Sequence, residues 1–284
     1  MEQITDPLAE HGEGPVWHAG WPGLRWVDML AGDVLELDPG TDRVSRHHVG
    51  VVAAALRPCP DGRAVIAVER GFALASADLG TVRPFGELWV DPGIRMNDGD
   101  CDPDGRFYCG SMAYDETPGA GRLFRLEHHG ATTVVLTGVT ISNGLAWSPD
   151  GGTAYYIDTP THRVDAFDYD ERRGLTARRT VFDIPVDAGA PDGMTVDTEG
   201  RLWIALWGGA AVRCYQADGR LLEHLALPVT QVTACTFGGP GLDELYVTTS
   251  RQTVPPGEQP EAGALFRARP GARGLPARQY VPGV

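Results

Sequence analysis

Three side chains that carry a carbonyl or carboxylate oxygen stand at one fixed distance, eight residues, before a turn glycine: Asn97, Asn143 and Asp192. Each opens a short apolar run that ends in an Asp-Gly or Glu-Gly turn, in the segments NDGDCDPDG, NGLAWSPDG and DGMTVDTEG. Residues at one position of a repeated unit share one position in the fold. If the units surround an axis, these side chains converge on one point.

The same count gives a position in the second and sixth units, and the first unit, whose turn is irregular, has a corresponding one, so that six positions form a ring. Glu13 opens the corresponding strand in GEGPVW, and Ala54 and Thr233 take the remaining two places. Carboxylate and amide oxygens, without thiolate or imidazole, suit Ca²⁺, Mg²⁺ or Mn²⁺, and Zn²⁺ through carboxylate oxygens. The alternative is that each polar side chain only caps backbone groups in a turn. Four polar positions in one phase favour a shared metal site.

The repeat itself predicts the fold. Turn glycines 62, 105, 151, 200 and 241 are separated by 43, 46, 49 and 41 residues. Each turn is followed by a β-rich run, such as RAVIAVER or RLWIALW, and then by further strands. Six units of roughly 45 residues, each with up to four strands, predict an all-β, six-bladed β-propeller formed by residues 1–284 as one domain. A sandwich or barrel would not explain the fixed phase.

In such a propeller the six phased positions lie at the end of the innermost strands away from the hairpin turns, around the mouth of the central channel. Trp17, Trp147 and Trp203 occur in the repeated strands, where they are expected to pack between blades. The five cysteines show no CxxC spacing and are expected to be buried as small hydrophobic side chains.

Charge and length exclude several classes of partner. The net charge is −14 and every basic residue is Arg, which argues against nucleic acid or an anionic membrane as partner. No segment approaches the length of a membrane span, and the first residues lack the basic start and apolar core of a signal peptide. We therefore expect a cytoplasmic protein.

Arg95 and the loop MAYDETPGAG contribute further polar groups near the predicted channel mouth. Arg95 lies two residues before Asn97, and the loop that contains Asp115 and Glu116 follows the second strand of the same unit. A guanidinium, an amide and a carboxylate beside one metal would orient a polyhydroxylated ligand. The alternative is an exposed loop held by salt bridges.

The motifs EGPVW, RMNDG, SNGLAWSPDG, YYIDT, VDAFDYD, PDGMTVDTEGRLW and TFGG follow one another along the chain. In this order the sequence resembles the SMP-30/gluconolactonase/LRE family of regucalcin-like sugar lactonases, from about residue 10 to about residue 268. The resemblance implies a six-bladed propeller with one divalent metal in its channel. It also implies Glu13, Asn143 and Asp192 as metal ligands and Arg95 and Asn97 as substrate contacts.

The chain departs from the regucalcin pattern at one place. Where those proteins carry consecutive glutamates after a Met-Ala pair, this chain has Tyr114, Asp115 and Glu116. Ungapped alignment gives the substrate contact to Asp115, whereas a shift of one residue gives it to Glu116. Both residues are therefore candidates.

The resemblance implies an enzyme of carbohydrate metabolism that hydrolyses a sugar lactone to its aldonic acid. The expected cofactor is one divalent ion, first Ca²⁺, with Mg²⁺, Mn²⁺, Zn²⁺ or Fe²⁺ as alternatives, acting as a Lewis acid. Asp192 is the candidate general base. Two other functions stay open, namely metal-dependent hydrolysis of another ester or phosphoester and non-catalytic divalent-metal binding. The sugar and the oligomeric state are not defined by the sequence.

Overall fold

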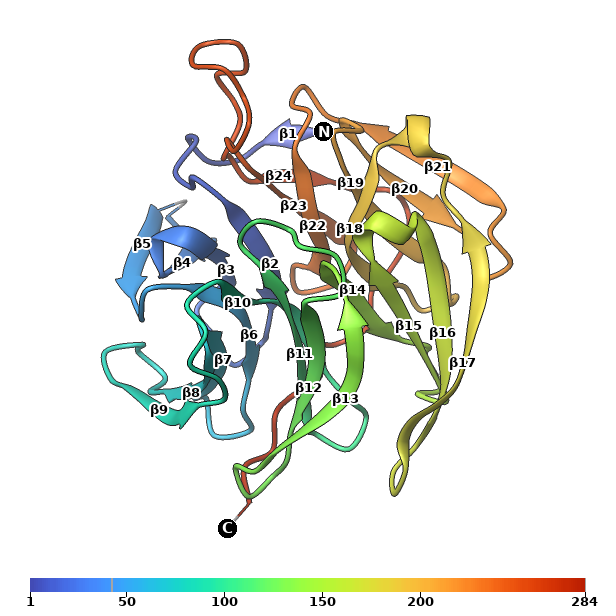
Figure 1. The fold of residues 1–284 in the computed structure, drawn as a ribbon. Coiled ribbons are helices and arrows are strands. Elements are labelled where there is room, and N and C mark those ends of the chain that lie inside the picture. Colours follow the sequence, from blue (N-terminus) through green and yellow to red (C-terminus); the bar gives the residue numbers. More distant parts are fainter. Residues whose placement is uncertain (42, 284) are drawn as a thin grey trace.

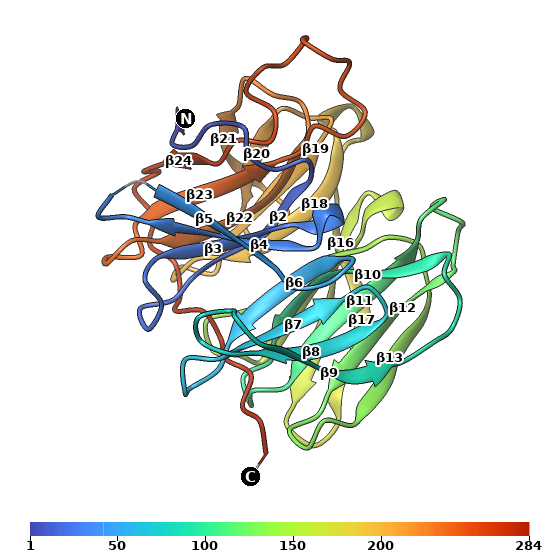
Figure 2. The same cartoon turned by 90° about the vertical axis from the view of Figure 1, so that its left-hand side faces the viewer.

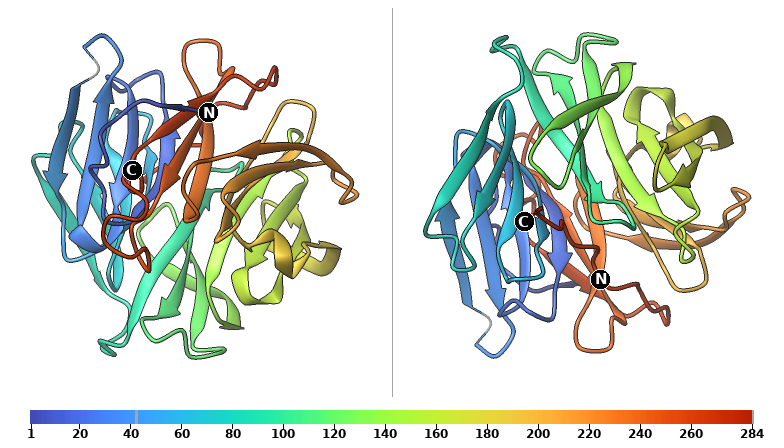
Figure 3. Two further views of the ribbon diagram at one scale, coloured as in Figure 1. Left: turned by 90° about the horizontal axis from the view of Figure 1, so that it is seen from above. Right: turned by 90° about the horizontal axis from the view of Figure 1, so that it is seen from below.

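The computed structural model describes residues 1–41 and 43–283, and it is built almost entirely of β-strands. The strands form six four-stranded antiparallel sheets, which follow one another around a centre in chain order (Figure 3). The predicted six-bladed β-propeller is thus confirmed. Helical structure in the described residues is limited to three 3₁₀ turns, η1 (Met29–Ala31), η2 (Thr159–Thr161) and η3 (Val186–Ala188). No helix in this part of the chain is long and apolar enough to cross a bilayer.

Five blades are continuous in sequence. They are formed by β2 (Gly12–Trp17), β3 (Leu24–Asp28), β4 (Asp33–Asp38) and β5 (Arg43–His48); by β6 (Ala53–Pro58), β7 (Ala64–Val68), β8 (Gly71–Ala75) and β9 (Val82–Glu87); by β10 (Ile94–Cys101), β11 (Phe107–Ala113), β12 (Gly121–Leu126) and β13 (Thr132–Val139); by β14 (Ser142–Trp147), β15 (Thr153–Asp158), β16 (Arg163–Asp170) and β17 (Gly174–Asp183); and by β18 (Ala190–Val196), β19 (Leu202–Trp207), β20 (Ala211–Tyr215) and β21 (Leu221–Ala226).

The sixth blade closes the ring with both ends of the chain. It contains β22 (Val232–Gly238), β23 (Glu244–Thr249), β24 (Phe266–Ala268) and the N-terminal β1 (Glu2–Gln3). In the outermost pair, Glu2 lies opposite Arg267 and Gln3 lies opposite Phe266. Figure 1 shows β1 beside β24, with the two termini at opposite ends of the molecule, and Figure 2 shows the same arrangement from the side. Strand pairing therefore joins the first residues to the last blade.

The first strand of each blade is the innermost one. Strands β2, β6, β10, β14, β18 and β22 each contact the first strand of the next blade, and β22 contacts β2. The predicted turns between first and second strands are also present. Their glycines, at positions 62, 105, 151 and 200, have φ between 75° and 87°, a conformation that L-residues with a side chain seldom adopt.

A segment near the C-terminus crosses the end of the ring where these turns lie. Within residues 273–283, the Gly274 N–H donates to the Leu242 carbonyl at 2.7 Å, and the Tyr280 N–H donates to the Pro58 carbonyl at 2.8 Å. The segment thus ties the sixth blade to the second, and it covers the channel end opposite the phased residues.

Aromatic side chains fill the spaces between blades. Trp203 is fully buried and meets Phe237 edge-on, with ring centroids 5.6 Å apart. The other two predicted tryptophans also make contacts across blade boundaries: Trp17 stacks on Tyr246, and Trp147 meets Tyr108 edge-on. Their predicted role between blades is confirmed. All five cysteines are buried and free, also as expected.

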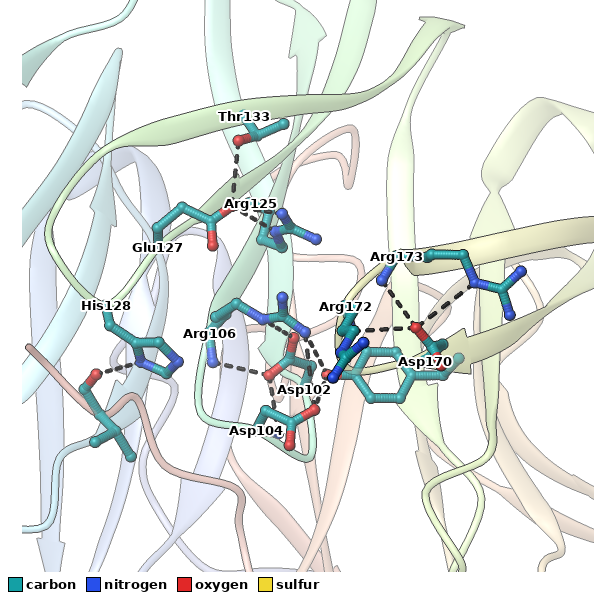
Figure 4. Close-up of polar contacts among 12 residues, drawn as sticks. Asp102, Asp104, Arg106, Arg125, Glu127, His128, Thr133, Asp170, Arg172 and Arg173 are labelled. Atoms are coloured by element: carbon teal, nitrogen blue, oxygen red, sulfur yellow. Dashed lines mark hydrogen bonds and ion pairs between the residues drawn. The ribbon is translucent and has the colours of Figure 1, made fainter.

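A polar cluster at the turn between β10 and β11 connects the third and fourth blades (Figure 4). Arg106 pairs with Asp102 at 2.7 Å, and both side chains are nearly buried. Tyr169, on β16, accepts a hydrogen bond from Arg106 at 2.7 Å and donates one to Asp104. Each hydrogen bond to a charged group contributes about 1.5–3 kcal/mol to the stability of the fold, so this cluster stabilises the contact between the two blades.

Candidate functional site

Every inner strand is irregular at the predicted phase. The strand register breaks between Glu13 and Val16, Ala53 and Ala55, Met96 and Gly99, Asn143 and Leu145, Pro191 and Met194, and Val232 and Ala234. Such β-bulges turn side chains out of the regular alternation, and they are common beside active sites. The six phased positions therefore share a backbone distortion as well as a sequence spacing.

Gly144 shows why one of these bulges needs glycine. Its φ is +27°, and a Cβ built at this position would lie 2.7 Å from the Asp192 carbonyl oxygen. Only glycine permits the approach of β14 to β18. The bulge therefore brings Asn143 close to the strand that carries Asp192.

Four of the six phased residues line one cavity of about 290 Å³. Its walls are His11, Glu13, Arg95, Asn97, Met112, Glu116, Ile141, Asn143, Thr159, Pro160, Ala190, Asp192, Trp207 and Gln252. The structure thus brings together the predicted residues Glu13, Arg95, Asn97, Glu116, Asn143 and Asp192. Ala54, Thr233 and Asp115 are not among the lining residues. Thr233 instead donates a hydrogen bond to the Gly12 carbonyl at 2.6 Å.

Two buried carboxylates face this cavity. Glu13 and Asp192 are 3% and 5% exposed. Burial and, next, repulsion from the Asp98 carboxylate raise the pKa of Glu13 to about 8, although the hydrogen bond from Gly14 N–H opposes this shift. Burial also raises the pKa of Asp192 well above its ordinary value, with added repulsion from Glu13 and Asp98. Oδ1 of Asp192 is buried without a hydrogen-bond partner.

These features fit a bound cation. Glu13, Asn143 and Asp192 come from β2, β14 and β18 and offer only oxygen atoms, the donor type that hard divalent cations prefer. A cation between Glu13 and Asp192 would relieve their repulsion and give the orphaned Oδ1 a partner. Among the described residues no group of three or more His, Cys, Asp or Glu side chains could hold a metal. The set therefore depends on the amide oxygen of Asn143.

Arg95 and Asn97 lie beside these carboxylates. Nη1 of Arg95 donates to Oδ1 of Asn97 at 2.7 Å, and Nδ2 of Asn97 donates to Oδ1 of Asn143 at 3.1 Å. Burial lowers the pKa of Arg95, although Tyr114, Glu13 and Asp192 favour its charged form. The cavity thus combines a cationic fork, an amide and carboxylates, which can hold hydroxyl groups of a small ligand.

The loop after β11 places its two acidic residues differently. Glu116 has φ of +57°, and its N–H donates to the Ala113 carbonyl at 3.0 Å, a turn that leaves Glu116 on the cavity wall. The exposed Asp115 instead accepts hydrogen bonds from the N–H and the hydroxyl of Thr117, at 3.0 and 2.7 Å. The structure therefore brings Glu116, and not Asp115, to the cavity.

Sequence reasoning did not single out His11, Trp207 or Gln252, which also line the cavity. The ring of His11 meets Trp207 edge-on at 5.9 Å, and its Nδ1 lies 2.9 Å from the Ser250 hydroxyl. Burial and, next, Arg95 lower the pKa of His11 to about 3, so the imidazole is neutral. His11 could have been predicted from its spacing, because side chains two residues apart on a strand point to the same face and His11 lies two residues before Glu13.

The pKa of Glu13 predicts how stability depends on pH. In the metal-free folded protein the Glu13 carboxyl group stays protonated up to a pH of about 8, whereas in the unfolded chain it loses its proton near pH 4.5. The resulting stabilisation is fully present below pH 4.5 and is lost as the pH rises through 8. Urea unfolding in a chelator should give a free energy of unfolding that falls across this range. For Glu13→Gln the free energy of unfolding should fall less steeply with pH. Equal slopes for the variant and the wild type would contradict the raised pKa of Glu13.

Fold and site together define a class: a six-bladed propeller with a cavity to which its inner strands contribute carboxylate and amide side chains. The sequence matches the family model described as SMP-30/Gluconolactonase/LRE-like region over residues 11–251. The chain belongs to this family, as its motifs predicted.

Individual relatives cover almost the whole chain. A pentonolactonase of Haloferax volcanii is 39% identical, with 97% of this chain and 96% of the relative aligned. Regucalcin of Danio rerio is 35% identical, over 99% and 98% of the two chains. A solved structure of regucalcin from Agrobacterium tumefaciens, described as a calcium-binding protein, superposes with a TM-score of 0.92 at 29% identity, over 98% and 96%.

Proposed function

We propose that this protein hydrolyses a sugar lactone to the corresponding aldonic acid with the help of one divalent metal ion. The observation that carries the proposal is the pair of buried carboxylates, Glu13 and Asp192, with an unpartnered oxygen facing a cavity that also holds Arg95. Membership of the family, and the activity for which the pentonolactonase relative is named, support it.

Glu13, Asn143 and Asp192 would hold the metal. The chemistry that a bound divalent ion supplies is Lewis-acid polarisation of the lactone carbonyl. Arg95 and Asn97 bind and orient the substrate oxygens. Asp192 takes a proton from the attacking water as that water adds to the carbonyl carbon, and it returns this proton to the ring oxygen as the ring C–O bond breaks.

The cavity volume limits the substrate. Ligand pockets span about 300–1,000 Å³, and this cavity of about 290 Å³ lies at the low end. Its polar wall, with Arg95, Asn97 and Glu116, suits a ligand rich in hydroxyl groups. Both features favour a monosaccharide lactone over an oligosaccharide or a large apolar ester.

A pH-indicator assay tests the proposal. Glucono-, xylono-, arabinono- and galactonolactone are offered to the chelator-treated protein before and after addition of Ca²⁺, Mg²⁺, Mn²⁺ or Zn²⁺, against the spontaneous rate. Turnover of at least one lactone that appears on metal addition is expected. If no lactone exceeds the background, the function moves to another ester or phosphoester, or to metal binding without catalysis.

The two acidic residues of the loop after β11 should differ in effect. Glu116→Ala removes a carboxylate from the cavity wall and should raise KM for the lactone by about 10-fold, since a hydrogen bond to a charged group contributes about 1.5–3 kcal/mol. Asp115→Ala, a matched control in the same loop, should leave KM within about two-fold. Steady-state kinetics checks both. The reverse order would give the substrate contact to Asp115.

A further inference from the structure

Four side chains of the cavity wall and one backbone carbonyl form one directional chain of hydrogen bonds. Arg95 Nη1 donates to Asn97 Oδ1 at 2.7 Å, and Asn97 Nδ2 donates to Asn143 Oδ1 at 3.1 Å. Asn143 Nδ2 then donates to Thr159 Oγ1 at 3.0 Å, and the Thr159 hydroxyl donates to the Pro191 carbonyl at 2.9 Å. The chain runs from β10 through β14 and η2 to β18, where its last member directly precedes Asp192.

The direction of this chain is fixed from both ends. A guanidinium can only donate, so the amide oxygen of Asn97 must face Arg95. A backbone carbonyl can only accept, so the Thr159 hydroxyl proton must point to Pro191 and its oxygen must accept from Asn143. Each constraint alone gives the amide of Asn143 the same orientation.

This orientation decides what Asn143 offers. With its NH₂ group held by Thr159, Oδ1 is the atom directed away from η2, toward Asn97. An amide oxygen has two lone pairs, so it can accept the bond from Asn97 and still face a cation. A flipped amide would set two NH₂ groups against each other and leave the Pro191 carbonyl without its donor.

We propose that Thr159 is a positioning residue that aims the amide oxygen of Asn143 at the metal and thereby sets the metal affinity of the site. Thr159 is nearly buried, at 9% exposed, and it belongs to a 3₁₀ turn, outside the inner strands that supply the ligands. The inference rests on the proposed function only for the identity of the ligand set. It adds a residue that acts through Asn143 and need not touch the ion.

Calorimetric titration of the chelator-treated full-length protein with Ca²⁺, repeated with Mn²⁺, tests this role without any activity measurement. Thr159→Val keeps the side-chain shape and removes the hydroxyl. It should weaken metal binding by about 10–100-fold, the usual effect of removing a group that orients a ligand. Thr159→Ser restores the hydroxyl and should bind within about three-fold of wild type.

Thr161→Val is the matched control. Thr161 lies on the same turn, and its hydroxyl donates only to the Asp158 carbonyl, at 2.7 Å. This variant should bind the metal as wild type does, and thermal unfolding of all metal-free variants reports damage to the turn itself. The proposal is overturned if Thr159→Val binds as tightly as wild type, or if Thr159→Ser or Thr161→Val loses as much affinity as Thr159→Val. Failure of lactone turnover with these metal affinities intact would overturn the proposed function alone.

Discussion

Replacing Asp192 by Asn is expected to lower kcat on a sugar lactone by at least ~10²-fold, even at saturating metal. Asparagine keeps the size of the side chain and one oxygen, but it cannot accept the proton of the attacking water. The buried position of Asp192 and its unpartnered Oδ1 place the lost group inside the cavity. Steady-state kinetics at several metal concentrations, corrected for spontaneous hydrolysis, measures the loss.

Asn97→Ala is the variant to compare with Asp192→Asn, because Asn97 is proposed to bind the substrate and Asp192 to act as the base. In the proposed mechanism the Asn97 amide orients the substrate equally in the ground state and in the transition state, so the variant should act mainly by raising KM. If metal-saturated Asp192→Asn keeps the turnover of the wild type, the base is another group. If Asn97→Ala lowers kcat as much as Asp192→Asn, Asn97 has a part in the chemical step.

Replacing Glu13 by Gln is expected to weaken binding of a divalent ion by at least ~10²-fold, beyond the ~10–100-fold range of changes around the ligands. The substitution removes one of the two carboxylates that face the cavity and leaves a neutral oxygen in its place. Calorimetric titration of the metal-free protein with Ca²⁺, Mg²⁺, Mn²⁺ and Zn²⁺, together with metal analysis of a chelator-free preparation, measures the effect.

Glu10→Gln provides the matched control for this measurement. Glu10 is exposed and stands three residues before Glu13, outside the residues that line the cavity. Glu10→Gln removes the same charge as Glu13→Gln, and its affinity for the divalent ion should stay within about two-fold of the wild-type value. Equal affinities for wild type and Glu13→Gln would remove Glu13 from the ligand set. Absence of binding by the wild type at millimolar concentration would leave the carboxylate pair as a structural feature.

The sequence predicted the fold well because a propeller repeats its own pattern. The count of eight residues from each turn glycine located the inner strands and selected Asn97, Asn143 and Asp192, and Glu13 was selected as the residue that opens the corresponding strand of the first unit. All four line one cavity. The assignment of roles to these residues, the division of the chain into one domain and the cytoplasmic location stay predictions.

Other features could not be obtained from the same pattern. Strand β1 has two residues, too few to show any alternation of polar and apolar positions. Whether Asp115 or Glu116 reaches the cavity depends on the backbone of the loop, in which Glu116 has a positive φ angle. Neither residue type determines this conformation. Thr159 and Trp207 line the cavity from elements outside the inner strands, where the eight-residue count does not apply.

The pairing of β1 with β24 also imposes an order in time on the synthesis of this protein. Residues 2–3 leave the ribosome before the other strands of the propeller, whereas their strand partners, residues 266–267, belong to the last strand to be made. At about 5–20 residues per second, the first strand waits for on the order of tens of seconds. Glu13 is synthesised early, whereas Gln252, which lines the same cavity, is synthesised late. The cavity is therefore completed only after the segment that carries Gln252 has been translated.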